Sequence, residues 1–425
     1  MTSEYQFLNV LETGWDVAVV GGGPAGSVLA ASLARRGRRV VLFEKDRFPR
    51  AKLCGEFLSG DAARHLDELG CLDAVLASGP ARIFGARLTT PSGSTLEVEL
   101  PGGAFGVSRR VLDQVLLRHA VHAGATVLEA ATVGSVRFRG GGTTPRPTDP
   151  GGAEVEVSLQ SEESEESGEE AARNGTLKGT IRAELAVGAH GRRSSLDHRL
   201  ERSFLSRSYP FVGFSRHHRL LAGTAGRKLA EELNGFVEVH TFDGGYCGMS
   251  FIEGREVNVC MLLDERFLKA LPSPRWFQLR EALGRIHPLL RRRFDALETS
   301  DETVHAVARV PCACKGTSAG AMLLVGDAAG MIPPFCGDGQ AMALESALLL
   351  SDRIAKKTGQ EISANFADLA RCWDRDWRSR FGFRMKLAQA LQQVLLRQRP
   401  AAIGLRIVKA VPGLAALLVG ATRGR

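Results

Sequence analysis

The sequence predicts an α/β protein with a parallel sheet flanked by helices, a second, antiparallel sheet and a C-terminal helical segment. Three observations lead to this fold class. Residues 15–45 read as strand, glycine-rich turn, helix and strand, the order of a β–α–β unit. Residues 211–263 alternate apolar and polar positions between glycine-rich turns, which is typical of antiparallel strands. Residues 339–357 and 364–397 carry apolar side chains at helical spacing.

Length and composition indicate a soluble globular protein of two or three domains. The chain has 425 residues, of which 44% are hydrophobic and 24% charged. The formal charge is +8, but the basic residues are spread along the chain without interleaved aromatic side chains, so we expect no nucleic-acid partner. The eight scattered cysteines predict neither a disulfide framework nor a metal site. We see neither a secretory signal nor an apolar run of the ~18–20 residues that span a bilayer, and therefore expect a cytoplasmic protein.

The glycine motif of the opening unit predicts a dinucleotide site. Gly21, Gly23 and Gly26 follow the first strand and open the helix at residues 24–37 with the spacing G-x-G-x-x-G. The first two glycines allow a tight turn and a close approach to a pyrophosphate, and the third lets the helix pack on the strand. Glu44 ends the second strand, where its carboxylate can accept hydrogen bonds from an adenosine ribose. The alternative is a glycine-rich turn in an ordinary α/β sheet.

A second turn, near the C-terminal end, indicates which dinucleotide is bound. Residues 321–350 read as a strand, then Gly326 and Asp327, a loop rich in proline and glycine, and a helix from Gly339. A nicotinamide cofactor needs no second sugar contact so far along the chain, whereas the long ribityl–isoalloxazine arm of FAD does. The alternative is that Asp327 is an ordinary helix N-cap.

This second motif resembles an FAD signature of the glutathione-reductase-like flavoproteins, most closely the group of aromatic hydroxylases, flavin-dependent halogenases and geranylgeranyl reductases. The resemblance implies a glutathione-reductase-like FAD-binding Rossmann domain. It also implies that Asp327 hydrogen-bonds the ribityl chain and that the helix from Gly339 points its N-terminus at the flavin, stabilising the anionic reduced form. The residues expected to bind FAD are Gly21, Gly23, Ala25, Gly26, Glu44, Lys45, Arg50, Arg109, Gly326, Asp327, Gly337, Gly339 and Gln340.

Two further segments extend the resemblance. Residues 43–62, "FEKDRFPRAKLCGEFLSGDA", are similar to the run that follows the ribose-binding acid in halogenases and geranylgeranyl reductases, which implies that Arg50 and Lys52 reach the FAD phosphates or the adenine edge. The helix "VSRRVLDQVL" resembles the R-x-x-L-D-x-x-L helix of the family, which implies that Arg109 lies near the pyrophosphate.

Two side chains after Arg50 have alternative interpretations. Cys54 is either a packed thiol, which we favour, or lies over the flavin. Glu56 is either an acid–base residue or, as we favour, a charge in the first turn of a helix. Between them, Gly55 would let the backbone approach the flavin.

The source of electrons depends on a third motif. Residues 184–197, "ELAVGAHGRRSSLD", resemble the middle signature of the hydroxylases, with His190 where an Asp is usual. In the family that Asp is linked to FAD and NAD(P)H contacts, so His190 argues against direct reduction by NAD(P)H. NAD(P)H and a separate flavin reductase or other donor therefore both stay open as the reductant. The role we favour for His190 is that of a hydrogen-bonded turn residue.

The motifs divide the chain into three parts. We expect a discontinuous FAD-binding domain at 1–80, 104–200 and 300–360, a substrate-facing antiparallel sheet at 81–103 and 201–299, and a C-terminal helical segment at 361–425. A mobile polar loop is expected at about 140–179, and its acidic run at 161–170 is interpreted as solvated. The apolar, cationic tail at 401–425 either packs on the core or lies in a membrane interface at the inner face of the membrane, interrupted by Pro412.

The motifs leave the reaction open among several classes. We favour an FAD-dependent monooxygenase that hydroxylates a small, apolar compound, preferably aromatic and of the polyketide or lipid type, in secondary metabolism. The weak candidates for substrate positioning or catalysis are Glu56, His217 and Tyr246, with His218 beside them. The first alternative is a reductase of carbon–carbon double bonds in prenyl or polyene lipids, and a flavin-dependent halogenase is the second. The non-enzyme alternative is a flavin-binding electron carrier.

Overall fold

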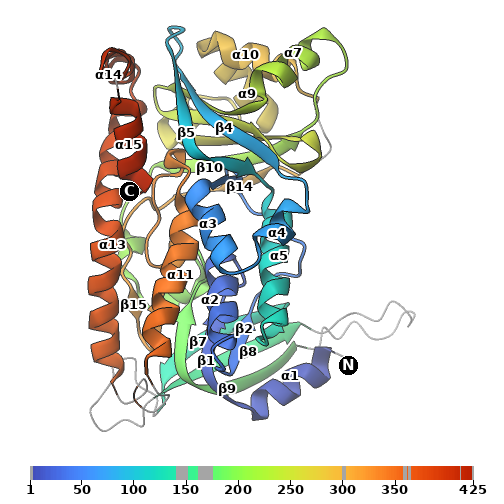
Figure 1. The fold of residues 1–425 in the computed structure, drawn as a ribbon, viewed down its shortest axis with the longest axis vertical. Coiled ribbons are helices and arrows are strands. Elements are labelled where there is room, and N and C mark those ends of the chain that lie inside the picture. The colour runs from blue at the N-terminus through green and yellow to red at the C-terminus, as the bar shows by residue number, and fades with distance from the viewer. Residues whose placement is uncertain are drawn as a thin grey trace.

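The computed structural model describes residues 3–139, 152–160, 176–298, 303–357, 361, 365–411 and 413–423. Within these residues two eight-stranded sheets form, one in each half of an elongated molecule (Figure 1). The predicted α/β class with C-terminal helices is confirmed. Within the polar segment at about 140–179, residues 153–160 form a strand, whereas its acidic run at 161–170 lies outside the described residues, as does Pro412.

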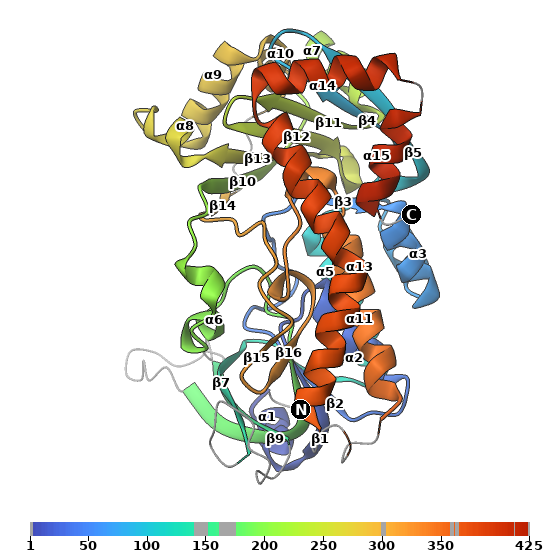
Figure 2. The same ribbon diagram turned by 90° about the vertical axis from the view of Figure 1, so that its left-hand side faces the viewer.

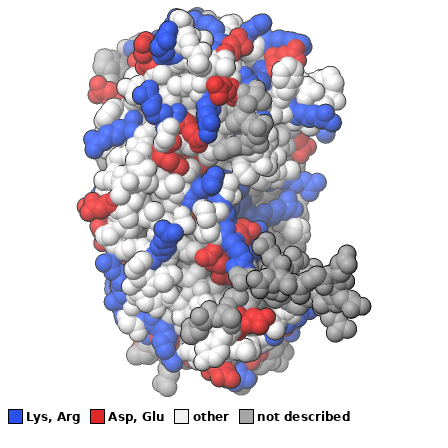
Figure 3. Space-filling view, turned by 90° about the vertical axis from the view of Figure 1, so that its right-hand side faces the viewer, with Lys and Arg blue, Asp and Glu red and all other residues white. Residues whose placement is uncertain are grey.

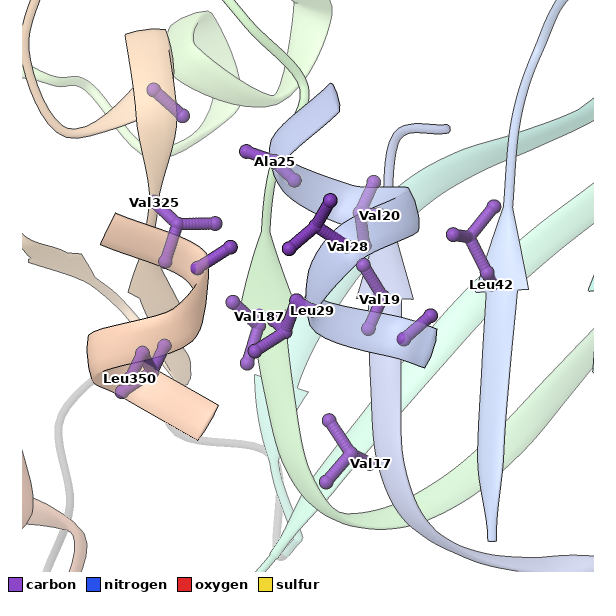
Figure 4. Packing of buried hydrophobic residues seen from close by; sticks show 14 of the residues in the cluster. Val17, Val19, Val20, Ala25, Val28, Leu29, Leu42, Val187, Val325 and Leu350 are labelled. Carbon is purple, nitrogen blue, oxygen red and sulfur yellow. The ribbon is translucent and has the colours of Figure 1, made fainter. Parts of the chain in front are cut away.

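The lower half in Figure 1 is built on the predicted β–α–β unit. Its elements are α1 (Ser3–Glu12), β1 (Gly14–Val20), α2 (Pro24–Ala34), β2 (Val40–Phe43), α3 (Gly60–Glu68), α4 (Leu72–Leu76), α5 (Arg109–His122), β6 (Thr126–Leu128), β7 (Ala131–Phe138), β8 (Ala153–Gln160), β9 (Thr176–Gly188), α6 (Ser195–Arg199), β15 (Ser318–Ala319), β16 (Met322–Leu324) and α11 (Gly339–Ala355). β1 pairs in parallel with β2 and β9, and β9 pairs in parallel with β16. Because helices cover this sheet, its central strands are apolar in continuous runs. Figure 4 shows Val28 and Leu29 of α2 packed on these strands.

The upper sheet is antiparallel, as expected, except at one pair of strands. The elements of this half are β3 (Phe57–Ser59), β4 (Ala81–Thr89), β5 (Thr95–Gly106), β10 (Phe211–His218), α7 (Thr224–Leu233), β11 (Gly235–Phe242), β12 (Gly245–Phe251), β13 (Val257–Asp264), α8 (Glu265–Lys269), α9 (Trp276–Ile286), α10 (Pro288–Asp295) and β14 (His305–Val307). β11 pairs in parallel with β4, which joins the two segments of the expected substrate-facing domain. Parallel neighbours require a long connection, and these two strands lie far apart in the chain.

The C-terminal helices connect the two halves. They are α13 (Phe366–Leu395), α14 (Gln398–Ala410) and α15 (Leu414–Arg423). α13 runs along the side of the molecule, and α14 and α15 lie against the upper half (Figure 2). Trp373, Trp377 and Phe381 form the buried stripe of α13 at the spacing of an amphipathic helix, and Trp373 Nε1 donates to the Leu324 carbonyl at 3.0 Å. The helices α14 and α15 therefore occupy most of the tail expected at 401–425, and both pack against α13.

The close contact between β1 and α2 depends on two glycines. Gly21 has a φ of +109°, and a Cβ there would lie 2.5 Å from the carbonyl oxygen of Ala189. A Cβ on Gly26 would lie 1.8 Å from the carbonyl oxygen of Gly21. Both obstacles are backbone atoms of the sheet and its turn, so a side chain cannot be accommodated by a change of rotamer.

We expect Gly26→Ala to destabilise the protein by more than about 3 kcal/mol, because the added methyl forces α2 away from β1. Gly382→Ala is the matched control. Gly382 lies inside α13 with open space around its missing Cβ, so this change should be neutral or stabilising by up to about 1 kcal/mol. Denaturant unfolding of both variants measures the difference, and equal midpoints would contradict the close contact.

Candidate active site

A cavity of about 170 Å³ lies at the carboxyl ends of the parallel strands, between the two halves of the molecule. Its walls are formed by residues from the N-termini of α2, α5 and α11 and from β12 and β13 of the upper sheet. The lining residues that the sequence analysis selected are Gly23, Ala25, Lys52, Cys54, Gly55, Glu56, Arg109, Tyr246, Asp327, Gly337, Gly339 and Gln340. Segments separated by more than half of the chain thus meet in one place.

Glu44, the expected ribose-binding acid, is held by the first glycine turn. It is buried, and its carboxylate accepts hydrogen bonds from the backbone N–H of Gly22 at 2.8 Å and of Asp46 at 3.1 Å. Arg50 lies 3.4 Å from the same carboxylate. Lys45 is exposed and pairs with Asp46. Like Gly21, Gly26, Glu44, Arg50 and Gly326, it lies outside the cavity lining.

Cations gather beside the first glycine turn. A Cβ on Gly23 would lie 3.7 Å from one guanidinium nitrogen of Arg109 and 3.9 Å from one of Arg50. Both arginines share Asp113, which accepts two hydrogen bonds of 2.6 Å from Arg109 and lies 3.2 Å from Arg50. Burial, together with the neighbouring Arg109 and Arg50, lowers the pKa of Lys52 to about 8. Crowded cations at a helix N-terminus favour a bound anion.

The second glycine turn touches the first. Asp327 lies in the short 3₁₀ helix η3 (Gly326–Ala328) and is half-buried against the cavity. A Cβ on Gly326 would lie 2.9 Å from the Cβ of Ala25, and Gly326 N–H donates to Ser346 Oγ at 2.9 Å. The N-cap of α11 is Asp338, which excludes the alternative that Asp327 caps this helix.

The first turn of α11 also faces the cavity. Gly337, with a φ of +67°, leads into the helix, and Gly339 begins it. Gln340 Nε2 donates to the Cys54 sulfur at 3.4 Å. Gln340 Oε1 is buried without a hydrogen-bond partner among the described residues. An unpartnered buried acceptor in a cavity wall is suited to a ligand N–H group.

Comparison with known proteins identifies the cofactor. A sequence family described as "FAD binding domain" matches residues 14–365. The chain belongs to this FAD-binding family. FAD is its cofactor, and the protein is an FAD-dependent oxidoreductase of the group that the sequence motifs indicated.

The relatives of this FAD-binding protein fall into several reaction classes. Menaquinone reductase of Mycobacterium tuberculosis is 27% identical over 396 residues, which are 89% of this chain and 84% of that protein. Several other curated relatives match over only 24–33% of their own length.

Solved structures show the shared fold at low sequence identity. The myxobacterial chondrochloren halogenase CndH has a TM-score of 0.67 and 22% identity, covering 87% of this chain and 81% of its own. PqsL of Pseudomonas aeruginosa, described as a probable FAD-dependent monooxygenase and solved with 2-aminobenzoylacetate, has a TM-score of 0.68 and 18% identity, covering 92% and 99%.

The residues of the cavity fit FAD. Lys52 and Arg109, beside the N-terminus of α2, suit the pyrophosphate, since each is a cation within the cavity lining. Asp327 offers an acceptor for the ribityl hydroxyls, and the unpartnered Gln340 Oε1 offers one for a flavin N–H. The N-terminus of α11 at Gly339 brings its positive dipole end to the same wall, as the resemblance implied.

The catalytic candidates occupy different positions. Tyr246 on β12 is 4% exposed and lines the cavity. Glu56 lines it too, with a φ of +53°, and its carboxylate accepts the N–H of Arg109 at 2.9 Å. Glu56 therefore caps the N-terminus of α5 instead of standing in the first turn of its own helix, which corrects our interpretation. His217 Nε2 lies 2.7 Å from the Glu56 carboxylate and borders a separate polar pocket.

Three further residues are placed as follows. His218 is buried outside the cavity lining and stacks on Trp276, so it does not contact a ligand there. His190 Nε2 lies 3.1 Å from Asp197, and burial lowers its pKa, which agrees with a hydrogen-bonded turn residue. Cys54 lines the cavity, contrary to the packed position that we favoured.

Arg192 is a cavity residue that the sequence analysis missed. It lines the wall and donates to the Leu53 carbonyl at 3.3 Å. Burial lowers its pKa, while the Asp327 carboxylate acts in the opposite direction. The sequence carries one signal for it, a cation two residues after His190 in the same loop. No cluster of candidate metal ligands occurs in the part of the chain that the structure describes.

We expect Asp327→Ala to weaken FAD binding about 10- to 100-fold, the effect of losing a hydrogen bond to a charged group. Asp352→Ala, which removes an exposed carboxylate paired with Arg36, is the control and should leave the affinity unchanged. Titration of the apoproteins with FAD, followed by flavin fluorescence, measures both constants. Equal affinities in the two variants would exclude the ribityl contact.

The lowered pKa of Lys52 predicts a pH dependence of FAD binding. Below about pH 8 Lys52 is protonated with or without the cofactor, so the affinity should be constant. Above that pH the free site loses the proton, and the affinity should fall up to about tenfold per pH unit until the raised pKa of the complex is reached. Lys52→Met should bind more weakly and lack this dependence. If the affinity for FAD still falls above about pH 8 in Lys52→Met, another group causes the pH dependence.

Proposed function

We propose that this protein is an FAD-dependent monooxygenase that hydroxylates an apolar, aromatic small molecule carrying a long hydrocarbon group. The observation that supports this proposal most directly is a second cavity of about 380 Å³, which adjoins the flavin cavity and is lined mainly by aliphatic side chains. A drug-sized ligand needs a pocket of about 300–1,000 Å³.

The two cavities share part of their walls. Gly55, Phe57, Tyr246, Cys260 and Gly337 line both. From this junction the apolar cavity extends between the upper sheet and the C-terminal helices. Its aliphatic walls are Ala86, Leu88, Leu96, Val98, Leu100, Val237 and Val239 of the sheet and Leu391, Val394, Leu395, Leu405, Ile407, Val408, Ala415 and Leu418 of the helices. A hydrocarbon group would therefore lie in the outer cavity while the ring reaches the flavin.

Tyr246 supplies the polar group at the junction. Its side chain is 4% exposed and lines both cavities. Burial raises the pKa of Tyr246, so the hydroxyl stays protonated and can donate a hydrogen bond to a phenolic oxygen. An aliphatic pocket with one such polar group orients a molecule that has a polar ring and an apolar chain.

Glu56 and His217 connect the flavin cavity with a more polar environment. Glu56 lines the flavin cavity, and His217 borders a pocket of about 370 Å³ that also contains Arg110, Ser215 and His305. The 2.7 Å contact between His217 Nε2 and the Glu56 carboxylate can pass a proton from the ring to this pocket. His217 and Glu56 are thus candidates for removing the phenolic proton.

The chemistry of the reaction sets the requirements for the site. Reduced FAD, when bound, supplies the two electrons with which oxygen is activated, so that one oxygen atom enters the ring and the other leaves as water. The protein must hold the ring close to the flavin and exclude bulk water. The aliphatic lining and the buried Tyr246 serve these two requirements.

A reductase of double bonds in an isoprenoid lipid is the second candidate. It is favoured by the similarity to menaquinone reductase over 89% of this chain, and the same apolar cavity suits a polyprenyl chain. A halogenase would use the same pocket and a halide.

The proposal predicts hydroxylation of 4-alkylphenols. Dithionite-reduced holoenzyme, mixed with ¹⁸O₂ and the phenol, should give a product with one ¹⁸O atom, detected by mass spectrometry. The half-saturating concentration should fall about three- to fourfold per added methylene until the chain fills the cavity. Tyr246→Phe should lower the single-turnover rate about tenfold with the FAD content unchanged, and Tyr5→Phe, at an exposed site, should not.

Two outcomes would contradict hydroxylation, and a third would contradict the proposed binding site. Oxidation of the reduced flavin by menaquinone without oxygen, with two hydrogens added to the side chain, would assign the protein to the reductases. A bromophenol formed only with bromide and oxygen would indicate a halogenase. A half-saturating concentration independent of chain length would exclude the apolar cavity as the binding site.

A further inference from the structure

The outer face of α14 carries apolar side chains. Ile403, Ile407 and Val411, spaced by four residues, are 58%, 53% and 47% exposed. Ala401 and Leu405, on the opposite side of the helix, are buried. A surface helix of a soluble domain usually has one apolar stripe, which faces the core. α14 has two apolar faces, and one of them has no covering element in the described structure.

The next helix, α15, also exposes an apolar side chain, and cations accompany the exposed apolar residues of α14. On α15, Leu417 is 65% exposed. Arg399 and Arg406 lie four residues before Ile403 and three residues after it, which places them on the same exposed side of α14. A helix with exposed apolar residues flanked by arginines is typical of a membrane interface.

The positive charge of the chain is concentrated after Asp376, which corrects the even spread that we expected. Of the cations there, three lie on α14, one on α15 and four on α13. The sequence contains no Asp or Glu after Asp376, whereas ten Lys and Arg residues follow it. The preceding 376 residues then hold 45 basic and 47 acidic residues, so the whole positive excess belongs to the C-terminal segment. On the face of the molecule shown in Figure 3, by contrast, basic and acidic side chains are interspersed.

The same two helices close the apolar cavity from outside. Leu405 and Val408 of α14, and Ala415 and Leu418 of α15, line it with their inner sides. Of the exposed residues, Ile403 and Leu417 lie outside the lining, whereas Ile407 also lines the cavity. A surface pressed against α14 and α15 would therefore meet the outer wall of the substrate cavity.

We propose that α14 and α15 form a docking face for an anionic phospholipid bilayer, which places the apolar cavity beside the lipid from which its substrate enters. The helices lie on the membrane and do not cross it, since no described helix is long and apolar enough to span a bilayer. Anionic lipid is the occupant that fits both features, because it offers hydrocarbon to the exposed apolar residues and negative charge to the cations. The route of substrate entry rests on the proposed function, but the docking itself does not.

Sedimentation of the holoenzyme with lipid vesicles tests the docking. Binding should be strong to an equimolar mixture of phosphatidylcholine and phosphatidylglycerol, at least tenfold weaker to phosphatidylcholine alone, and reduced by salt. The double variants Ile403→Asp with Leu417→Asp, and Arg399→Glu with Arg406→Glu, should each lose at least tenfold in affinity. Retained flavin absorbance shows that the variants are folded.

Two matched controls keep this test specific. Phe277→Asp changes a 73% exposed aromatic residue on α9, and Arg291→Glu reverses an exposed cation on α10. Both should bind vesicles like the unchanged protein. Equal losses in controls and α14–α15 variants, or equal binding to neutral and anionic vesicles, would overturn the proposal.

Three further results distinguish membrane docking from a dimer interface and from a failure of the proposed reaction. A dimer of the unchanged protein that becomes a monomer in the Ile403–Leu417 variant, without vesicle binding by either, would assign the face to a second copy of the chain and overturn the proposal. If docking serves entry, a long-chain alkylphenol embedded in vesicles should turn over at least tenfold more slowly in this variant, while a short, water-soluble alkylphenol is unaffected. If the Ile403–Leu417 variant loses vesicle binding and the unchanged protein hydroxylates neither phenol, the docking face is retained and only the proposed function is refuted.

Discussion

The contact between the two glycine turns is the constraint on which the site depends. Gly26 lets α2 approach the turn after β1, and Gly326 lets the turn after β16 approach Ala25 at the start of α2. These contacts leave no room for a side chain, so they fix the distance between segments about 300 residues apart in the chain. The N-termini of α2 and α11 then face one cavity, which can hold the two ends of a single FAD molecule.

The electrostatics of the cavity follow from this arrangement. Arg50, Lys52 and Arg109 are drawn to one helix N-terminus, where Glu44 and Asp113 offset their charges only in part. Burial, and after it the neighbouring Arg109 and Arg50, lower the pKa of Lys52. A pyrophosphate restores the balance, so FAD contributes to the stability of the fold that binds it.

The substrate side is governed by shape and hydrophobicity. The upper sheet supplies one aliphatic wall, and α13, α14 and α15 supply the other. The cavity beside the glycine turns is lined by charged residues, and Tyr246 lies on the wall that the two cavities share. The helices α14 and α15 form one layer with apolar residues on both sides. Those on the inner side line the cavity, and Ile403 and Leu417 are exposed on the outer side.

The sequence by itself determined the β–α–β unit, the two glycine turns, the fold class and the FAD cofactor. These features depend on short spacings, in which local backbone geometry dictates the residue type. Only the tertiary structure decided that Glu56 caps α5, that Arg192 lines the cavity, that β4 and β11 run in parallel, and that the C-terminal helices enclose an apolar cavity. Each of these depends on packing between segments far apart in the chain, and no local periodicity encodes which surfaces will meet.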